Sequence, residues 1–179
     1  AAVFTGMVVV VTSLAMSPAS ADGPTPDPAT ARLEVDFLGD MIDHHAMAVD
    51  MAEMCEDKAA HDELRSMCEE IATAQSAEIV AMQSWLQDWY GVSHAPSMPA
   101  GQMRRMEGMA ELDPAAFEVE FMETMVRHHR QAVREAGQCV NRAGHADLVD
   151  LCENIIETQT HEIELMQGWL CDWYDRCGG

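Results

Sequence analysis

The feature that most constrains the fold of this chain is an internal repeat. The stretch from Phe37 to Cys55 recurs 84 residues later, from Phe121 to Cys139, and the two copies stay in register without a gap as far as Tyr90 and Tyr174. A repeat of this length is a folding unit rather than a short solenoid period. The sequence therefore predicts two half-units that share one core.

The first copy has the apolar spacing of a buried helix. At about 100° per residue, its apolar side chains form one stripe, and His44 and His45 both lie inside that stripe. Met41, three and four residues before them, lies one turn below on the same face. Two imidazoles and a thioether thus converge on the side that we expect to be buried.

Four long helices follow from the same spacing, at residues 31–57, 61–90, 114–141 and 145–174. A short turn within each copy makes an antiparallel hairpin, and two hairpins with one apolar face each must pack face to face. We predict an all-α fold, an antiparallel four-helix bundle built from two duplicated helical hairpins in one joint domain, residues 31–179. The Trp-Leu-x-Asp-Trp-Tyr endings of both copies are interpreted as an aromatic plug at one end of the bundle.

The N-terminal segment is typical of an export signal, because an apolar run is followed by the small-x-small pattern Ala19-Ser20-Ala21. We interpret residues 1–21 as a truncated signal peptide that is cut after Ala21, and residues 22–30 as a Pro-rich leader. The apolar run is too short for a convincing membrane span. We therefore expect a periplasmic or extracellular protein without a stable span.

Six cysteines in an exported protein favour disulfide bonds over free thiols. Equivalent positions in the two copies narrow the possible pairings, and each short loop closed in this way would stabilise the fold by about 3 kcal/mol. The predicted bonds are Cys55 with Cys68 and Cys139 with Cys152, which leave Cys171 and Cys177.

The Cys55–Cys68 bond would set the register of the first hairpin, because residues whose numbers sum to about 123 then face each other. His45 faces Glu78 on this arithmetic, and the second hairpin pairs His129 with Glu162. Polar groups that a core normally excludes are thereby gathered at one level of the bundle. The other facing pairs are Ala48 with Gln75, Met41 with Met82, Ala132 with Gln159, and Met125 with Met166.

The charge of the chain excludes polyanionic partners. With 31 acidic and 10 basic residues its formal net charge is −21, whereas nucleic-acid binding depends on Lys and Arg. The acidity indicates a solvated surface, or alternatively a field that gathers cations.

Residues 91–113 connect the two copies, and Met103, Met106 and Met109 recur there at a spacing of three. We interpret them as a short amphipathic helix lying over the bundle. The alternative is a soft-metal patch completed by Met98 and His94.

Imidazole with thioether suits Cu(I) or Ag(I), whereas Mg and Ca prefer oxygen ligands. We therefore predict a soft-metal site in each half of the chain. Gln75, Glu78, Gln159 and Glu162 would be ligands or groups that orient the histidines. The candidate ligands are Met41, His44, His45, Met47, Met51 and Met82 in the first half, and Met125, His128, His129 and Met166 in the second.

The two sites are expected to differ in strength. In the first copy Met47, Met51 and Met54 follow the histidines along the helix, and their counterparts in the second copy carry no sulfur. The first site is therefore the better soft-metal candidate. The counterparts are Gln131, Glu135 and Gln138.

Other functions remain open with less support. The histidines could be hydrogen-bonded core residues of a structural or interaction bundle, and an iron or copper oxidoreductase ranks third. A di-iron centre needs Glu-x-x-His pairs, which do not precede these histidines. No catalytic Ser-His-acid or Cys-His arrangement can be singled out, so we expect a protein that is not an enzyme. The sequence points to no particular protein partner.

Two patterns in each copy resemble the family called domain of unknown function 305. They are Phe-x-x-x-Met-[Ile/Val]-x-His-His, followed by Ala48 or Ala132, and Gln-x-x-Glu-Ile-x-x-Met-x-x-Trp-Leu from Gln75 or Gln159. The resemblance implies two tandem copies in an exported, ferritin-like helical bundle that binds copper through Met and His. Carried over by position, it implies ligation by Met41, His44, His45 and Met82, and by Met125, His128, His129 and Met166.

Overall fold

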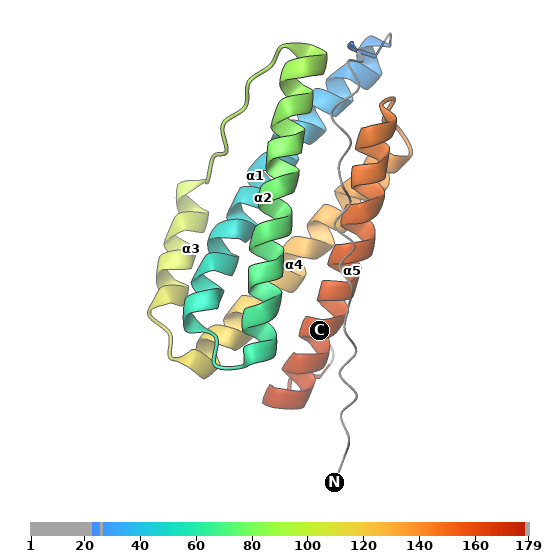
Figure 1. Ribbon diagram of the computed structural model, residues 1–179. Helices are drawn as coiled ribbons and strands as arrows, with labels where there is room; N and C mark the ends of the chain where they lie inside the picture. Colours follow the sequence, from blue (N-terminus) through green and yellow to red (C-terminus); the bar gives the residue numbers. More distant parts are fainter. Residues whose placement is uncertain (1–22, 26, 178–179) are drawn as a thin grey trace.

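The computed structural model describes residues 23–25 and 27–177, and it is all-helical over these residues (Figure 1). The predicted signal segment, residues 1–21, lies outside the described part. None of the helices in the described ranges is long and apolar enough to cross a membrane. The helices are α1 (Pro28–Lys58), α2 (Asp62–Tyr90), α3 (Ala100–Ala110), α4 (Pro114–Val140) and α5 (Ala146–Tyr174).

Helix α1 begins three residues earlier than predicted, inside the expected leader, because its start is capped. The Asp27 side chain accepts a hydrogen bond from the Thr30 backbone N–H at 2.9 Å, and Pro28 occupies the first helical position, where a missing N–H costs nothing. Helix α4 is capped in the same way: the Asp113 side chain accepts a hydrogen bond from the Ala116 backbone N–H, and Pro114 occupies the first helical position. The other helix ends lie within a residue of the predicted ones.

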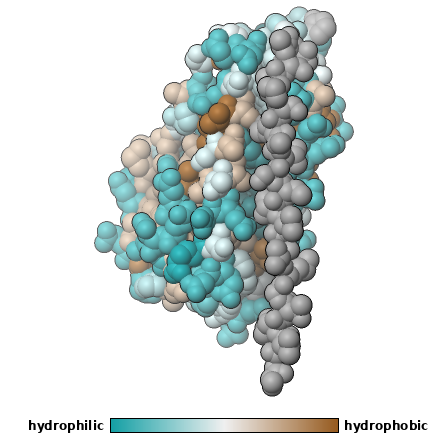
Figure 2. Space-filling model, in the orientation of Figure 1, coloured by the Kyte–Doolittle hydropathy of each residue, from teal (hydrophilic) through white to brown (hydrophobic). Residues whose placement is uncertain are grey.

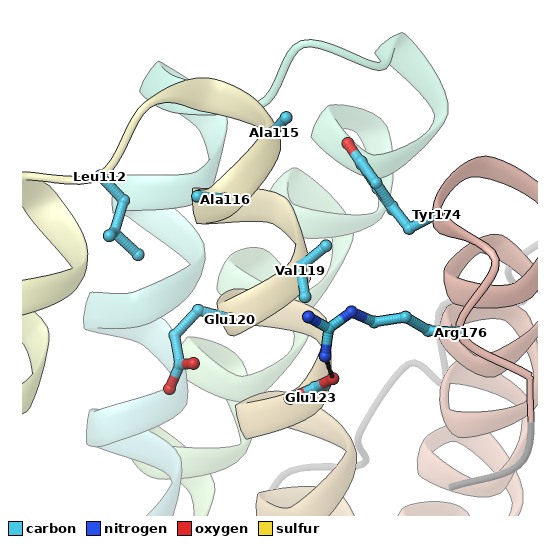
Figure 3. Close-up of a pocket in the computed structure, with 8 residues that line it drawn as sticks. All are labelled: Leu112, Ala115, Ala116, Val119, Glu120, Glu123, Tyr174 and Arg176. Atoms are coloured by element: carbon cyan, nitrogen blue, oxygen red, sulfur yellow. Dashed lines mark hydrogen bonds and ion pairs between the residues drawn. The ribbon is translucent and has the colours of Figure 1, made fainter.

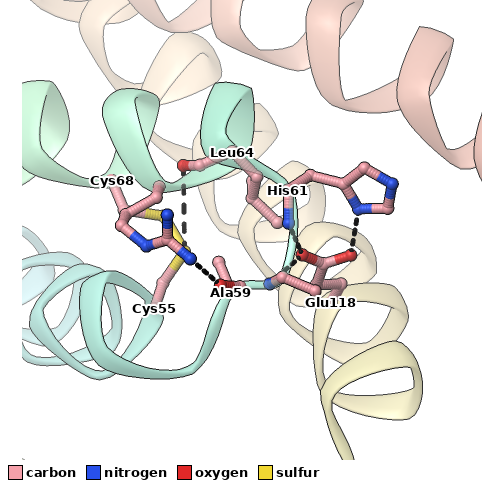
Figure 4. Close-up of a disulfide and its surroundings, with 8 residues drawn as sticks. Cys55, Ala59, His61, Leu64, Cys68 and Glu118 are labelled. Atoms are coloured by element: carbon pink, nitrogen blue, oxygen red, sulfur yellow. Dashed lines mark hydrogen bonds and ion pairs between the residues drawn. A yellow bond between two sulfur atoms is a disulfide. The ribbon is translucent and has the colours of Figure 1, made fainter.

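Two helical hairpins make up the bundle, since α1 packs along α2, α4 packs along α5, and α1 contacts α4 between them. The predicted disulfides close both turns, as Figure 4 shows for Cys55–Cys68. Their two cysteines are 13 residues apart in each hairpin, a loop that stabilises a fold by about 3 kcal/mol in the chain-entropy model. The Cys139–Cys152 bond and a third bond, Cys171–Cys177, complete the set.

The turn of the first hairpin is held by a carboxylate from the second. The buried Glu118, near the start of α4, accepts hydrogen bonds from the backbone N–H groups of Ala60 at 2.6 Å and His61 at 2.8 Å, and contacts His61 Nδ1 at 2.7 Å (Figure 4). The hydroxyl of Tyr174 also donates to it. Trp173 stacks on the His61 ring at 3.8 Å between centroids.

An equivalent set of contacts exists at the opposite end, where a carboxylate of the first hairpin binds the turn of the second. We call each set, a buried glutamate with the turn that it binds, a lock. Glu34 of α1 accepts hydrogen bonds from the backbone N–H groups of Gly144 at 2.6 Å and His145 at 3.1 Å, and from the Tyr90 hydroxyl. Trp89 stacks on His145 at 3.7 Å. The two hairpins therefore lie head to tail. The expectation of one aromatic plug is wrong, because Trp89 stacks at the turn of the second hairpin and Trp173 at the turn of the first. Helices α2 and α5 end at opposite ends of the bundle (Figure 1).

The core is divided into two apolar halves. Each long helix passes from one half to the other at a buried polar position, namely His45 in α1, Gln75 in α2, His129 in α4 and Gln159 in α5. Outside the core, hydrophilic residues cover much of the face shown in Figure 2. A polar layer thus crosses the middle of the bundle, where the predicted site residues lie.

Helix α3 is the short amphipathic helix predicted from the methionine spacing. Met109 is 2 % exposed and Met106 packs against the core, whereas Met103 is 50 % exposed. Helix α3 contacts α4, and Lys58 Nζ at the end of α1 donates to the Ala110 carbonyl at 2.6 Å.

We predict that Glu118→Gln destabilises the protein by roughly 1–3 kcal/mol at neutral pH, because an amide cannot accept from all of these donors. Burial by itself would raise the pKa of the Glu118 carboxyl, but hydrogen bonds from Tyr174, His61 and Ala60 outweigh it and hold the pKa below its ordinary value of 4.5. A carboxyl with a lowered native pKa stabilises the fold above the unfolded pKa, and this contribution is lost as the pH falls through the native pKa.

Urea unfolding followed by circular dichroism at a series of pH values would measure the effect. The difference between wild type and Glu118→Gln should be largest near neutral pH and should shrink on acidification. Glu107→Gln, at an exposed position of α3, is the matched control. A difference that stayed constant or grew as the pH fell would contradict the lock.

Candidate metal centre

The two histidine pairs meet in one cluster. The rings of His44 in α1 and His128 in α4 have their centroids 3.5 Å apart. Their chain neighbours are close, with 6.3 Å between the His44 and His45 rings and 6.1 Å between the His128 and His129 rings. The sequence predicts one site in each half of the chain. In the structure the two histidine pairs lie against each other where α1 and α4 are in contact.

The outer histidine of each pair contacts a glutamate of its own hairpin. His45 Nε2 lies 2.8 Å from Glu78 Oε2, in a hydrogen bond, and His129 Nε2 lies 2.7 Å from Glu162 Oε2. Both contacts are the ones predicted from the disulfide register. A carboxylate at one ring nitrogen fixes the orientation of the imidazole and leaves the other nitrogen available to a ligand.

The two central histidines have no such partner. Within the described residues, neither ring nitrogen of His44 or His128 makes a hydrogen bond, and the same holds for Nδ1 of His45 and of His129. A buried polar group without a partner costs about 1–3 kcal/mol. Several unpartnered imidazole nitrogens at one level of a core therefore fit a ligand that takes nitrogen donors.

The central imidazoles are neutral at physiological pH. Burial lowers the pKa of His44 to about 3, with further lowering by the nearby His45 and His129 and a weak opposing effect from the backbone of His128. Burial also holds the pKa of His128 well below its ordinary value of 6.5, helped by the three neighbouring histidines. Neutral imidazole is the form that binds metal ions.

The predicted methionine ligands divide between the two sides of this layer. Met41 and Met82 belong to one apolar half of the core, and Met125 and Met166 belong to the other; all four are fully buried. Met51 and the partly buried Met47 lie with Met125 and Met166. The thioethers therefore flank the histidine cluster from both sides, with one predicted pair from each hairpin, and only Met47 and Met51 lie on the side of the other hairpin's pair.

Oxygen and nitrogen donors alone do not form a complete set in the described part of the chain. No group of three or more His, Cys, Asp or Glu side chains is arranged there to hold a metal ion. The remaining predicted residues, Gln75 and Gln159, are buried in the same layer, and the side-chain oxygen of each is without a hydrogen-bond partner among the described residues. A metal held here would need sulfur ligands or a small rearrangement of the imidazoles.

One surface pocket of the described structure touches predicted site residues, and a larger one does not. A pocket of about 450 Å³ between the start of α4 and the end of α5 contains the Arg176–Glu123 ion pair and none of them (Figure 3). The other, of about 260 Å³, reaches the histidine cluster. Its walls are formed by Asp40, Asp43, His44, Met47, Ser97, Pro99, Gln102, Gln131 and Glu135.

Two groups that shape the site were not predicted from the sequence. Asn154 of α5 donates a hydrogen bond to Glu78 Oε1 at 3.1 Å, across the two hairpins, and no pattern in the sequence points to it. Glu34 and Glu118 were detectable, because they are 84 residues apart and so occupy equivalent positions of the repeat.

The chain matches the family described as "Domain of unknown function (DUF305)" over residues 34–170. Among solved structures it is similar to CopM in the Cu(I)-bound form, with 31% identity, a TM-score of 0.72, and coverage of 79% of this chain and 97% of CopM. The Ag-bound form gives the same identity and coverage with a TM-score of 0.71.

A DUF305 protein from Streptomyces coelicolor, provisionally described as secreted, is 27% identical with a TM-score of 0.71, over 82% of this chain and 96% of its own. A DUF305 fragment from Deinococcus radiodurans is 26% identical with a TM-score of 0.69, over 83% of this chain and 97% of its own. No curated protein sequence matches the chain. A family match over most of the chain, together with these structural relatives, shows that the protein belongs to the DUF305 family.

Proposed function

We propose that this protein binds Cu(I), or Ag(I) in its place, outside the cytoplasm, and that it sequesters the ion or hands it on. The observation that carries the proposal is the buried contact between His44 and His128, whose ring nitrogens have no hydrogen-bond partner among the described residues. One cluster shared by both hairpins would hold the metal, with thioethers from the flanking core halves.

The chemistry of the donors supports a soft monovalent ion. Neutral imidazoles and thioethers are ligands that Cu(I) and Ag(I) accept, whereas hard cations prefer oxygen. Glu78 and Glu162 would act on the metal through His45 and His129, by fixing the rings. Structures of the relative CopM are described in Cu(I)-bound, Cu(II)-bound and Ag-bound forms, which is consistent with this donor set.

The finer features of the architecture and location belong to the same proposal. We infer an antiparallel four-helix bundle of the ferritin-like type that arose as two tandem hairpins. Export is supported by the three disulfides, which persist in oxidising compartments, and by the relative that is provisionally described as secreted.

A structural bundle is the second candidate, favoured by two observations. The described residues contain no preformed group of three His, Cys, Asp or Glu ligands, and His45 is already hydrogen-bonded to Glu78. On this alternative the polar layer would only specify how the hairpins pack.

Competition titration of the mature protein with Cu(I) against a chromophoric chelator separates the two candidates. We predict tight binding by the wild type, and comparable losses for the double variants His44→Ala/His45→Ala and His128→Ala/His129→Ala, because the rings form one cluster. This outcome differs from the asymmetry expected from the methionines of the first copy.

Each double variant must keep its helical circular dichroism, since it removes part of a buried layer. His161→Ala, at an exposed position of α5, is the control and should bind like the wild type. A variant in which all four cluster histidines are changed to Ala is the final test. If it bound Cu(I) as tightly as the wild type, the structural bundle would be the function that is left. A large loss from the first pair alone would restore the two-site interpretation.

We predict that Glu78→Gln weakens Cu(I) binding by about tenfold to a hundredfold, because loss of a partner that orients a ligand typically costs this much. Glu164→Gln, exposed on α5, should leave the affinity unchanged. The same titration measures both. A loss as complete as that of the double histidine variants would make Glu78 a ligand itself, and no loss would remove its orienting role.

A further inference from the structure

The histidine cluster borders a surface pocket on one side, and the ring nitrogens of His44 are themselves buried. His45 and His129 are fully buried and His128 is 5 % exposed, whereas His44 is partly buried and borders the pocket of about 260 Å³ described above. That volume exceeds the roughly 30 Å³ that one water occupies in the liquid. Since the His44 ring lies against His128, the pocket leads to the centre of the cluster.

The groups around this pocket could first attract a cation and then bind it as soft-metal ligands. Asp40 and Glu135 supply carboxylates from α1 and α4, which attract positive charge. Met47 supplies a thioether one turn from His44, and thioether with imidazole is a ligand pair for Cu(I). Donors are therefore present along the wall that ends at the cluster.

The outer wall of the pocket is fixed to α1 directly beside His44. Asp43 contacts His94 Nε2 at 2.8 Å, and it accepts hydrogen bonds from the backbone N–H of Ser97 at 2.8 Å and from the Ser97 hydroxyl at 2.9 Å. Gln83 of α2 donates to the His94 carbonyl at 2.9 Å. The segment that leads into α3 is thereby held as a wall with Pro99 and Gln102.

This wall breaks the symmetry of the repeat. The position equivalent to Asp43 in the second copy is Arg127, which donates to Thr124 of its own helix at 2.8 Å. The carboxylate of α1 that anchors the connecting segment therefore has no counterpart at the equivalent position of α4. The pocket borders His44, while its counterpart His128 is buried.

We propose that metal enters and leaves the histidine cluster through this pocket, passing from Met47 to His44 and then to His128. This inference rests on the proposed function and adds the route by which the buried centre exchanges its ion. The carboxylates at the pocket attract the cation, and the thioether and His44 take it from water.

Filling the pocket tests the route without touching a proposed ligand. Gln131→Trp places a large side chain in the α4 wall and Gln102→Trp does so in the α3 wall; both positions are exposed. Gln138→Trp, also exposed on α4 but outside the pocket, is the matched control. Stopped-flow transfer of Cu(I) from each protein to a chromophoric chelator, and the reverse loading, gives both rates, and titration gives the equilibrium affinity.

Both pocket-filling variants should slow loading and release together by about tenfold or more with little change in Kd, because Kd is the ratio of the two rate constants. Gln138→Trp should exchange at the wild-type rate. Wild-type rates in both filled variants, each shown to be helical, would overturn the route while leaving the proposed function intact. Absence of Cu(I) binding by the wild type would instead overturn the proposed function.

Discussion

The packing of the two hairpins depends on two buried carboxylates. Each hairpin contributes one of them, and it binds the turn of the other hairpin. Glu34 holds the turn around His145 and Glu118 holds the turn around His61. Because the two locks lie at opposite ends, they set how far one hairpin is displaced along the other. Equivalent residues in the middle of α1 and α4 then meet, which brings His44 against His128. The contacts at the two ends of the bundle thus determine which histidines meet at its centre.

A symmetric frame would place both central histidines in the same environment, and the connector makes them different. Asp43 of α1 anchors the segment before α3, whereas the equivalent position of α4 is Arg127. This contact builds a pocket on one side of the polar layer. The duplicated hairpins therefore provide the paired imidazoles. The connector, which occurs once, places a pocket on one side of them.

The sequence predicted those features that depend on contacts within one hairpin. Helix periodicity and the spacing of Cys55 and Cys68 set the register, so that the contact between His45 and Glu78 followed by arithmetic and is confirmed. The relation between the hairpins could not be obtained in this way. A repeat pattern is the same whether two copies pack head to head or head to tail, so the contact between His44 and His128 and the opposite placement of the aromatic ends were missed. The cross-hairpin bond from Asn154 to Glu78 depends on the same packing.

The central claim is that one metal centre is shared between the hairpins at His44 and His128. A crystal structure of the mature protein loaded with Ag(I), with the ion located by its anomalous scattering, tests it most directly. We expect an ion in the polar layer that is bound by nitrogen atoms from both His44 and His128. Ions confined to one hairpin each, or bound by methionines alone with both imidazoles uninvolved, would contradict it.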